Sequence, residues 1–336
     1  MTKPFFSVLI LFWKSAQYLQ AVLQALEEQT FKDFEVILLD NGAEEPPDPV
    51  LLSQHPHLNL HLLCSETNLG FAGGNNLAAR QAQGDYLVLL NSDAFPEPDW
   101  LATIHQAALS HPRHCFASRL LQADNPALLD GEWNVYHASG LAWRKNHNRS
   151  VSFSSTEPRH VMSACAAASA YPRSAFEQVG GFDEDFFAYM EDIDLDLRLR
   201  LAGYDCLYLP EAVVHHVGSG STGSRSDFST FYGHRNLIWA FVKNMPGLLL
   251  WLLLPAHLIV NIAYLLAGLF MSNGKTLWQA KKAAITGLPD VLQKRQLIQS
   301  KRTTSVWRFA KLINWNPLFP LTKLLYRDPS FQEKYD

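Results

Sequence analysis

Four carboxylates crowd the start of one predicted helix. Glu191 and Asp192 open it, and Asp194 and Asp196 follow within its first two turns. A helix dipole favours acidic residues in the first turn, so the cluster has a purely structural interpretation. Capping does not need so many carboxylates, and their repulsion raises the pKa of at least one, which suits a general base. We predict that Asp194 and Asp196 pair with Arg198 and Arg200 of the same helix on solvated faces.

Two further polar clusters directly follow apolar runs of strand length. They read Asp40-Asn41-Gly42 and Asn91-Ser92-Asp93. Ligands of open α/β sheets bind beyond the carboxyl ends of the strands, where both clusters are expected to lie. A carboxylate such as Asp93 suits Mg²⁺ or Mn²⁺, which prefer oxygen ligands and often take only one or two from the protein. The alternative is that Asp93 only caps the turn that follows it.

A glycine-rich segment precedes another predicted helix. Residues 68–76 read NLGFAGGNN, which offers Asn68, Gly70, Gly73 and Asn75 to a ligand. Glycines let backbone N–H groups approach a diphosphate, and a helix N-terminus favours its charge. The spacing differs from the dinucleotide fingerprint, and the segment follows the third predicted strand rather than the first, which argues against a dinucleotide-dependent oxidoreductase. Glycines also serve turns for steric reasons alone.

A histidine pair closes a later apolar strand. His215 and His216 are followed by a run of Gly and Ser residues, 218–224. Histidine binds metals and phosphates, although a structural role is an equal alternative here. The flexible residues after the pair suggest a lid hinge.

The elements that must position these residues alternate between strand and helix. Apolar runs predict strands at 5–12, 34–39, 58–63, 86–90, 161–171, 206–209 and 212–214, and helices are predicted after Ser15, at 75–83 and at 190–202. This alternation predicts an α/β domain with a mainly parallel sheet flanked by helices. The polar stretch 124–160 gives no clear element.

Taken in order, these marks resemble the glycosyltransferases of family 2, which have the GT-A fold, and in particular their bacterial rhamnosyltransferase-like members. The resemblance covers about residues 5–240. It rests on the first strand and its helix, on the three clusters around Asp40, Gly70 and Asp93, and on Gly181-Phe182-Asp183-Glu184 leading to Glu191-Asp192.

The resemblance implies a role for each candidate residue. Asp40 and Asn41 would bind the base of a nucleotide-sugar donor, and the 68–75 segment would line its ribose and diphosphate. Asp93 would be the last position of the Asp-x-Asp motif that binds Mg²⁺ or Mn²⁺. Asn91 stands where the motif usually begins with Asp, so Asp93 is the main expected ligand. His216 would approach the metal or diphosphate.

The same resemblance implies the reaction. Asp192 would take the proton of an acceptor hydroxyl, with Glu191 positioning it, and a single displacement would invert the sugar. The donor would be a deoxythymidine- or uridine-diphosphate sugar, such as the rhamnose donor, and the acceptor a glycan or a lipid-linked glycan of a surface polysaccharide. The alternative is a non-catalytic nucleotide-sugar-binding module.

The last third of the chain differs in character. Acidic residues dominate up to Phe270 and basic ones after it, and residues 244–274 contain no Asp, Glu, Lys or Arg. We predict a 1–240 catalytic domain and a helical 241–336 segment that meets an anionic membrane surface, with residues 247–270 peripheral or re-entrant rather than spanning. The alternative is a buried helix pair. No secretory signal is evident, so we expect the cytoplasmic face of the inner membrane. The net charge of −4 gives no indication of nucleic-acid binding.

Overall fold

The computed structural model describes residues 3–218 and 226–317, and the lid hinge predicted after His216 lies mostly outside them. Its main sheet has the strand order β10-β12-β6-β11-β4-β1-β2-β3. The pairs β1–β2, β1–β4, β2–β3 and β6–β12 are parallel, while β11 runs antiparallel to β4 and β6. This confirms the predicted α/β class.

The strands are β1 (Phe6–Phe12), β2 (Phe34–Asn41), β3 (Leu60–Ser65), β4 (Tyr86–Leu90), β5 (Ala94–Pro96), β6 (His114–Gln122), β7 (Leu129–Gly131), β8 (Asn134–Tyr136), β9 (Ala142–Arg144), β10 (Arg159–His160), β11 (Ala168–Pro172) and β12 (Asp205–His216). The residues of β2 and β4 are buried throughout, because helices cover both faces of the sheet.

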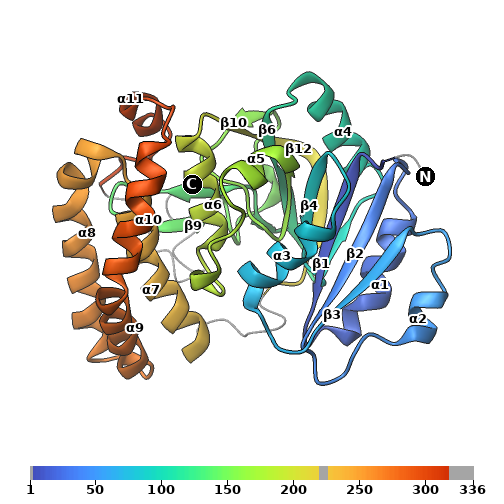
Figure 1. Ribbon diagram of the computed structural model, residues 1–336, viewed down its shortest axis with the longest axis horizontal. Helices are drawn as coiled ribbons and strands as arrows, with labels where there is room; N and C mark the ends of the chain where they lie inside the picture. Colours follow the sequence, from blue (N-terminus) through green and yellow to red (C-terminus); the bar gives the residue numbers. More distant parts are fainter. Residues whose placement is uncertain (1–2, 219–225, 318–336) are drawn as a thin grey trace.

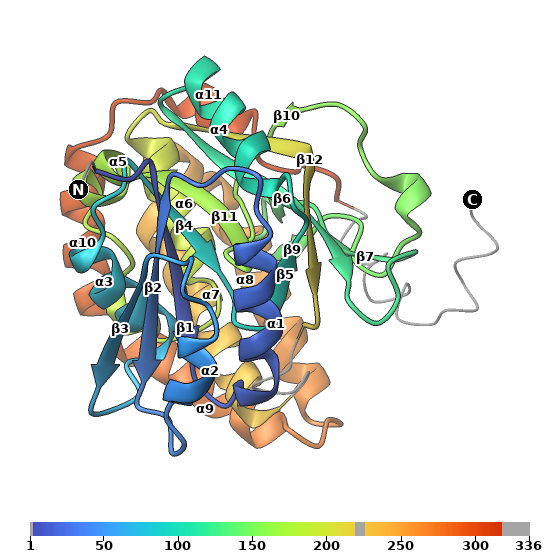
Figure 2. The same cartoon turned by 90° about the vertical axis from the view of Figure 1, so that its right-hand side faces the viewer.

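The helices form two layers around this sheet. On one face pack α1 (Ala16–Glu27), α2 (Pro49–Ser53) and α4 (Trp100–Ser110), and on the other α3 (Gly70–Gln81), α5 (Arg173–Gln178) and α6 (Glu191–Leu201). Figure 2 shows α1 and α3 on opposite sides of the strands. The predicted apolar stripe of α1, Leu19, Val22, Leu23 and Leu26, is fully buried.

Three local expectations are wrong. The helix expected from Asn75 begins at Gly70, so the glycine-rich segment forms its first turns rather than a loop. The two short strands expected at 206–214 form one strand, β12, with an irregularity between Leu209 and Val213. The strand expected from Val161 begins only at Ala168.

The C-terminal helices gather at one end of the molecule (Figure 1). They are α7 (Asp227–Asn244), α8 (Gly247–Gly268), α9 (Gly274–Thr286), α10 (Leu288–Ser300) and α11 (Val306–Ala310). α7 contacts α6, α9 and α10, and it runs through residue 240, where the sequence suggested a domain boundary. The C-terminal helices therefore pack against the helix that carries the acidic cluster.

Candidate functional site

The predicted site residues converge on one pocket of about 420 Å³ at the carboxyl ends of β1, β2 and β4. Its wall includes Asn41, Asn68, Gly70, Asn91, Asp93, Glu191, Asp192 and His216. The remaining candidates lie behind this wall. Asp40 is buried and accepts the Ala43 N–H at 2.9 Å, and Asn75 donates to Phe71 O inside α3, one turn beyond Gly70. Gly73 also lies within α3.

The N-terminus of α3 forms one side of the pocket. Asn41 holds it: its Oδ1 accepts the Leu69 N–H at 3.0 Å, and its Nδ2 donates to Gly70 O at 3.1 Å. Gly70 has a φ of +71°, and a Cβ there would lie 2.5 Å from Phe187 O, so only glycine fits. The N–H groups of Leu69, Gly70 and Ala72 are bonded within the protein, to Asn41, Asn68 and Phe187. The positive end of the helix dipole still favours an anion at this end of the pocket.

A buried triad of charged groups forms a second side. His216 Nδ1 lies 2.7 Å from Asp130 Oδ2, and its Nε2 lies 3.3 Å from Asp93 Oδ1. Burial opposes the charged imidazole, but hydrogen bonds to Asp130 and Asp93 outweigh it and raise the pKa of His216 to about 9. Arg144 pairs with Asp130 as well, and Asn91 lies 3.3 Å from His216 Nε2.

These side chains fit a hard divalent cation. One Asp93 oxygen and His216 Nε2 are close enough to share an ion, which would replace the Nε2 proton of the charged imidazole. Asp130 orients the imidazole from behind, as carboxylates commonly do for metal-binding histidines. Within residues 3–218 and 226–317, no group of three or more His, Cys, Asp or Glu side chains could hold a metal. Such a cation would therefore take most of its ligands from phosphate and water, which Mg²⁺ commonly does.

The acidic cluster forms the third side. Asp192 Oδ2 accepts from Asn134 Nδ2 at 2.9 Å, and its Oδ1 accepts the Ile193 N–H at 2.7 Å. Burial raises the pKa of Asp192, and these hydrogen bonds to the charged form only partly offset it. Burial, with the neighbouring Asp192 charge, also raises the pKa of Glu191, whose Oε2 has no partner among the described residues. An ionisable group poised in this way suits proton transfer.

The comparisons with known proteins decide the family. The sequence profile of "Glycosyl transferase family 2" matches residues 7–180, about half of the chain. The chain belongs to glycosyltransferase family 2. Its sequence is 28% identical over 251 residues to an N-acetylglucosaminyl-diphospho-decaprenol L-rhamnosyltransferase of Mycobacterium tuberculosis, covering 68% of this chain and 80% of that protein. This family 2 glycosyltransferase is thus rhamnosyltransferase-like, as its motifs suggested.

Solved structures show the same fold at low sequence identity. A mannosyltransferase of Pyrobaculum calidifontis, in complex with GDP-Man and Mn²⁺, superposes with a TM-score of 0.55 and 17% identity over 99% of this chain and 83% of that one. Residues 1–349 of S. aureus TarS, in complex with UDP-GlcNAc, give a TM-score of 0.56 and 14% identity over 94% and 92% of the two chains. The GT-A fold of this glycosyltransferase is therefore established.

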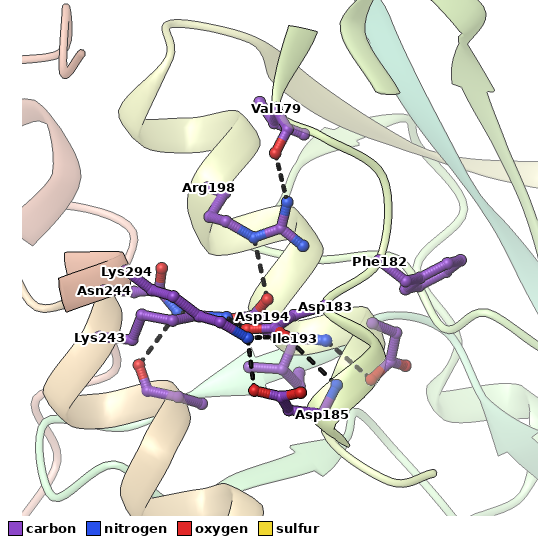
Figure 3. Close-up of polar contacts among 12 residues, drawn as sticks. Val179, Phe182, Asp183, Asp185, Ile193, Asp194, Arg198, Lys243, Asn244 and Lys294 are labelled. Carbon is purple, nitrogen blue, oxygen red and sulfur yellow. Dashed lines mark hydrogen bonds and ion pairs between the residues drawn. The ribbon is translucent and has the colours of Figure 1, made fainter. Parts of the chain in front are cut away.

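The other carboxylates of the cluster have structural roles in the glycosyltransferase. Asp194 pairs with Arg198, as expected, and also accepts from Lys243 and Asn244 of α7 at 2.7 Å each (Figure 3). These groups are buried, so the expected solvated face is wrong. Asp196 is also buried and accepts the Ala164 N–H at 2.7 Å instead of pairing with an arginine of α6.

A larger hollow of about 810 Å³ lies beside these contacts of Asp194, between α3, α5, α6 and α10. Its wall holds Asp183, which pairs with Lys243 and with Lys294 at 2.5 Å each, as Figure 3 shows. The residues that suit sugar transfer line the smaller pocket, so we place the site of the glycosyltransferase there.

Sequence reasoning missed several residues of the pocket. Asn134, Arg144 and Asp130 come from the stretch 124–160, whose short strands β7 to β9 leave no clear pattern. Asp130 reaches His216 because β7 and β12 both pair with β6. The one available signal was the polar composition of this stretch. The aromatic residues Phe187, Tyr189 and Phe228 also line the pocket, and no sequence motif marked them.

Proposed function

We propose that this glycosyltransferase transfers a sugar, with inversion, from a deoxythymidine- or uridine-diphosphate donor to a hydroxyl of a glycan or lipid-linked acceptor. The rhamnose donor is the first candidate, because a similar protein is named an L-rhamnosyltransferase whose acceptor is a diphospho-decaprenol. The observation that carries the proposal is that the N-terminus of α3, a carboxylate–histidine pair and a candidate base share one pocket.

The donor diphosphate would lie between the N-terminus of α3 and Asp93. Asn68 and Gly70 border it on the helix side, and His216 borders it on the other. Mg²⁺ or Mn²⁺, held by Asp93 with His216, would neutralise the negative charge on the departing diphosphate. Asp130 would keep the His216 imidazole oriented through Nδ1. Of the other sequence candidates, Asp40 and Asn41 would support the nucleotide side, and Gly73 and Asn75 would support α3.

Asp192 would act on the opposite side of the sugar. Its carboxylate accepts the proton of the acceptor hydroxyl while that oxygen bonds to the anomeric carbon and the bond to the diphosphate breaks. One displacement from the opposite face inverts the anomeric centre. Asn134 and the Ile193 N–H orient the carboxylate, and Glu191 lies directly beside it.

We also propose that α8 lies on an anionic membrane at its cytoplasmic face. α8 has the length and apolarity to cross a membrane, yet only 28% of its most apolar 18-residue stretch is buried inside the protein. Its polar side chains point inward: His257 bonds to Ser139 O, and Asn261 accepts from Lys281. Its exposed face is apolar and includes Trp251, Leu252, Ile259, Ile262 and Leu266. An apolar outer face with an anchored inner face suits a peripheral or re-entrant helix.

The decisive experiment is a donor screen followed by variants of Asp93. A matching nucleotide sugar should raise the melting temperature in the presence of Mn²⁺, because it binds only the folded state. Asp93→Asn should nearly abolish transfer and weaken the Mn²⁺-dependent part of donor binding, without unfolding the protein. Glu97→Gln, a nearby exposed carboxylate paired with His215, is the control. Full transfer by Asp93→Asn at saturating donor would exclude the metal role of Asp93. Donor binding without turnover on any acceptor would favour the binding-module alternative.

A further inference from the structure

The segment 187–190 leads directly into the acidic cluster and is strained. Phe187, Tyr189 and Met190 have φ values of 64°, 65° and 69°, in the left-handed region that side chains other than glycine rarely adopt. All three line the active-site pocket, and Met190 is the residue from which α6 starts. Strained backbone of this kind persists only where its surroundings hold it.

One buried side chain makes several hydrogen bonds to this part of the chain. Asn236 of α7 is fully buried, and its Nδ2 lies 2.9 Å from Phe186 O, 2.9 Å from Ala188 O and 2.7 Å from Tyr189 O. Because carbonyl oxygens only accept, the amide nitrogen must face the segment. Arg235 fixes this orientation, since its Nε donates to Asn236 Oδ1 at 2.8 Å.

Two other side chains of α7 contact the same part of the chain. Arg235 Nη2 also donates to Asp185 O at 2.6 Å and to Phe186 O at 3.1 Å, just before the strained segment. From α7, the ring of Phe228 lies about 6 Å from those of Phe187 and Tyr189. α7 therefore contacts this wall of the pocket through both amide and ring contacts.

We infer that Asn236 is a positioning residue that holds segment 187–190 in its left-handed conformation and thereby sets where Asp192 meets the acceptor. The inference rests on the proposed function, because it assumes that Asp192 is the base. Asn236 does not line the pocket, so it acts only through the segment. Loss of its amide removes a shared donor from Ala188 O and Tyr189 O, whereas Phe186 O keeps its bond from Arg235. The segment can then relax to ordinary dihedrals while the fold survives.

The test compares Asn236→Leu with Asn261→Leu. Both replace a buried asparagine by a side chain of similar volume, but Asn261 lies on α8 and bonds to Lys281 and His257 O, away from the pocket. We expect Asn236→Leu to lower kcat at saturating substrates at least tenfold, with less than a threefold change in nucleoside-diphosphate affinity in Mn²⁺. Asn261→Leu should lower the melting temperature without this change in kcat. If Asn236→Leu does not fold, Asn236→Ser replaces it in the same comparison.

A double-mutant cycle separates this inference from the proposed base. If Asn236 acts through Asp192, Asn236→Leu should cost kcat less than threefold in an Asp192→Asn background. An equal loss in both backgrounds, or a kcat loss no larger than that of Asn261→Leu, would overturn the positioning role. If Asp192→Asn alone transfers at the wild-type rate, Asp192 is not the base. This outcome is measured on the single variant and does not depend on Asn236.

Discussion

At the scale of single residues, Asp192 and Glu191 sit side by side but in different surroundings. Asp192 accepts three hydrogen bonds, from Asn134 and from the N–H groups of Ala166 and Ile193, whereas Glu191 Oε2 has no partner among the described residues. Burial raises the pKa of both. Hydrogen bonds therefore stabilise the charge of Asp192 better than that of Glu191, which suits the residue that must be ionised to act.

Exchanging these two carboxylates for amides should separate their roles. We expect Asp192→Asn to slow sugar transfer by about 10²-fold or more, the usual range of general-base help, while donor affinity changes little. Glu191→Gln should cost less. Donor affinity by calorimetry and transfer rate by nucleotide release give the two quantities. A dead Glu191→Gln with an active Asp192→Asn would exchange the roles, and normal rates for both would place the base elsewhere.

The pH profile should follow the environment of Asp192. A base works when ionised, and a raised pKa keeps Asp192 protonated at pH values where an ordinary aspartate, with a pKa of about 3.9, is charged. Transfer should therefore fall with decreasing pH before ordinary aspartates titrate. Asn134→Ser removes a hydrogen bond to the charged form, so it should move this acid limb to still higher pH. Measured kcat against pH for both proteins checks the direction, and a limb that stays or moves down contradicts the assignment.

At the scale of elements, the sequence predicted strands better than the loops between them. β1, β2 and β4 are mostly apolar and almost entirely buried, as expected for a sheet covered on both faces, so their polar ends were located correctly. The start of α3 was missed because glycine has low helix propensity, and here Asn41 and Phe187 impose the helix from outside. The short strands β7 to β9 depend on distant pairing partners, which no local pattern reveals.

Two glycines of α3 offer a direct test of how this element serves the site. Gly70→Ala forces a Cβ against Phe187 O at a φ of +71° and should destabilise the protein by about 1–2 kcal/mol or more, with loss of donor binding. Gly73→Ala has ordinary helical dihedrals and meets only Leu69 Cβ at 3.1 Å. It should fold and bind donor nearly as the wild type does. Chemical denaturation and donor calorimetry measure both effects. Loss of donor binding by Gly73→Ala alone would instead place Gly73 against the ligand.

At the scale of the whole molecule, the basic tail is less available than its composition suggested. Lys294 pairs with Asp183 and Asp185, Arg308 pairs with Asp205, and Lys281 is buried against Asn261. Lys294 and Arg308 thus hold the C-terminal helices to the rest of the protein, and Lys281 holds α9 to α8. Deletion of the tail would therefore expose the core, and single exposed side chains are the better probes of membrane contact.

The sequence contains four cysteines, Cys64, Cys115, Cys165 and Cys206. All are free, and Cys115 and Cys206 are buried, but Cys64 is exposed.

The exposed face of α8 leads to the last prediction, that apolar burial outweighs charge in membrane binding. Ile259 and Leu266 are 67% and 59% exposed, and full burial of such a side chain contributes about 1.5–3 kcal/mol. The double variant Ile259→Gln/Leu266→Gln should lower partition onto anionic vesicles tenfold or more. The matched control, Val50→Gln/Leu109→Gln, changes equally exposed residues of α2 and α4, at 65% and 60%, and should bind normally.

Salt separates the two forces in the same vesicle experiment. Raising the ionic strength from about 0.15 M to 0.5 M screens surface charges, since the screening length is already about 8 Å at 0.15 M, but it leaves apolar burial intact. Because several basic side chains are engaged within the protein, salt should weaken binding less than the double variant does. A larger effect of salt would make charge the dominant force. Unchanged vesicle binding by the α8 variant, together with conversion of a dimer to a monomer, would instead make this face a contact between two copies of the chain.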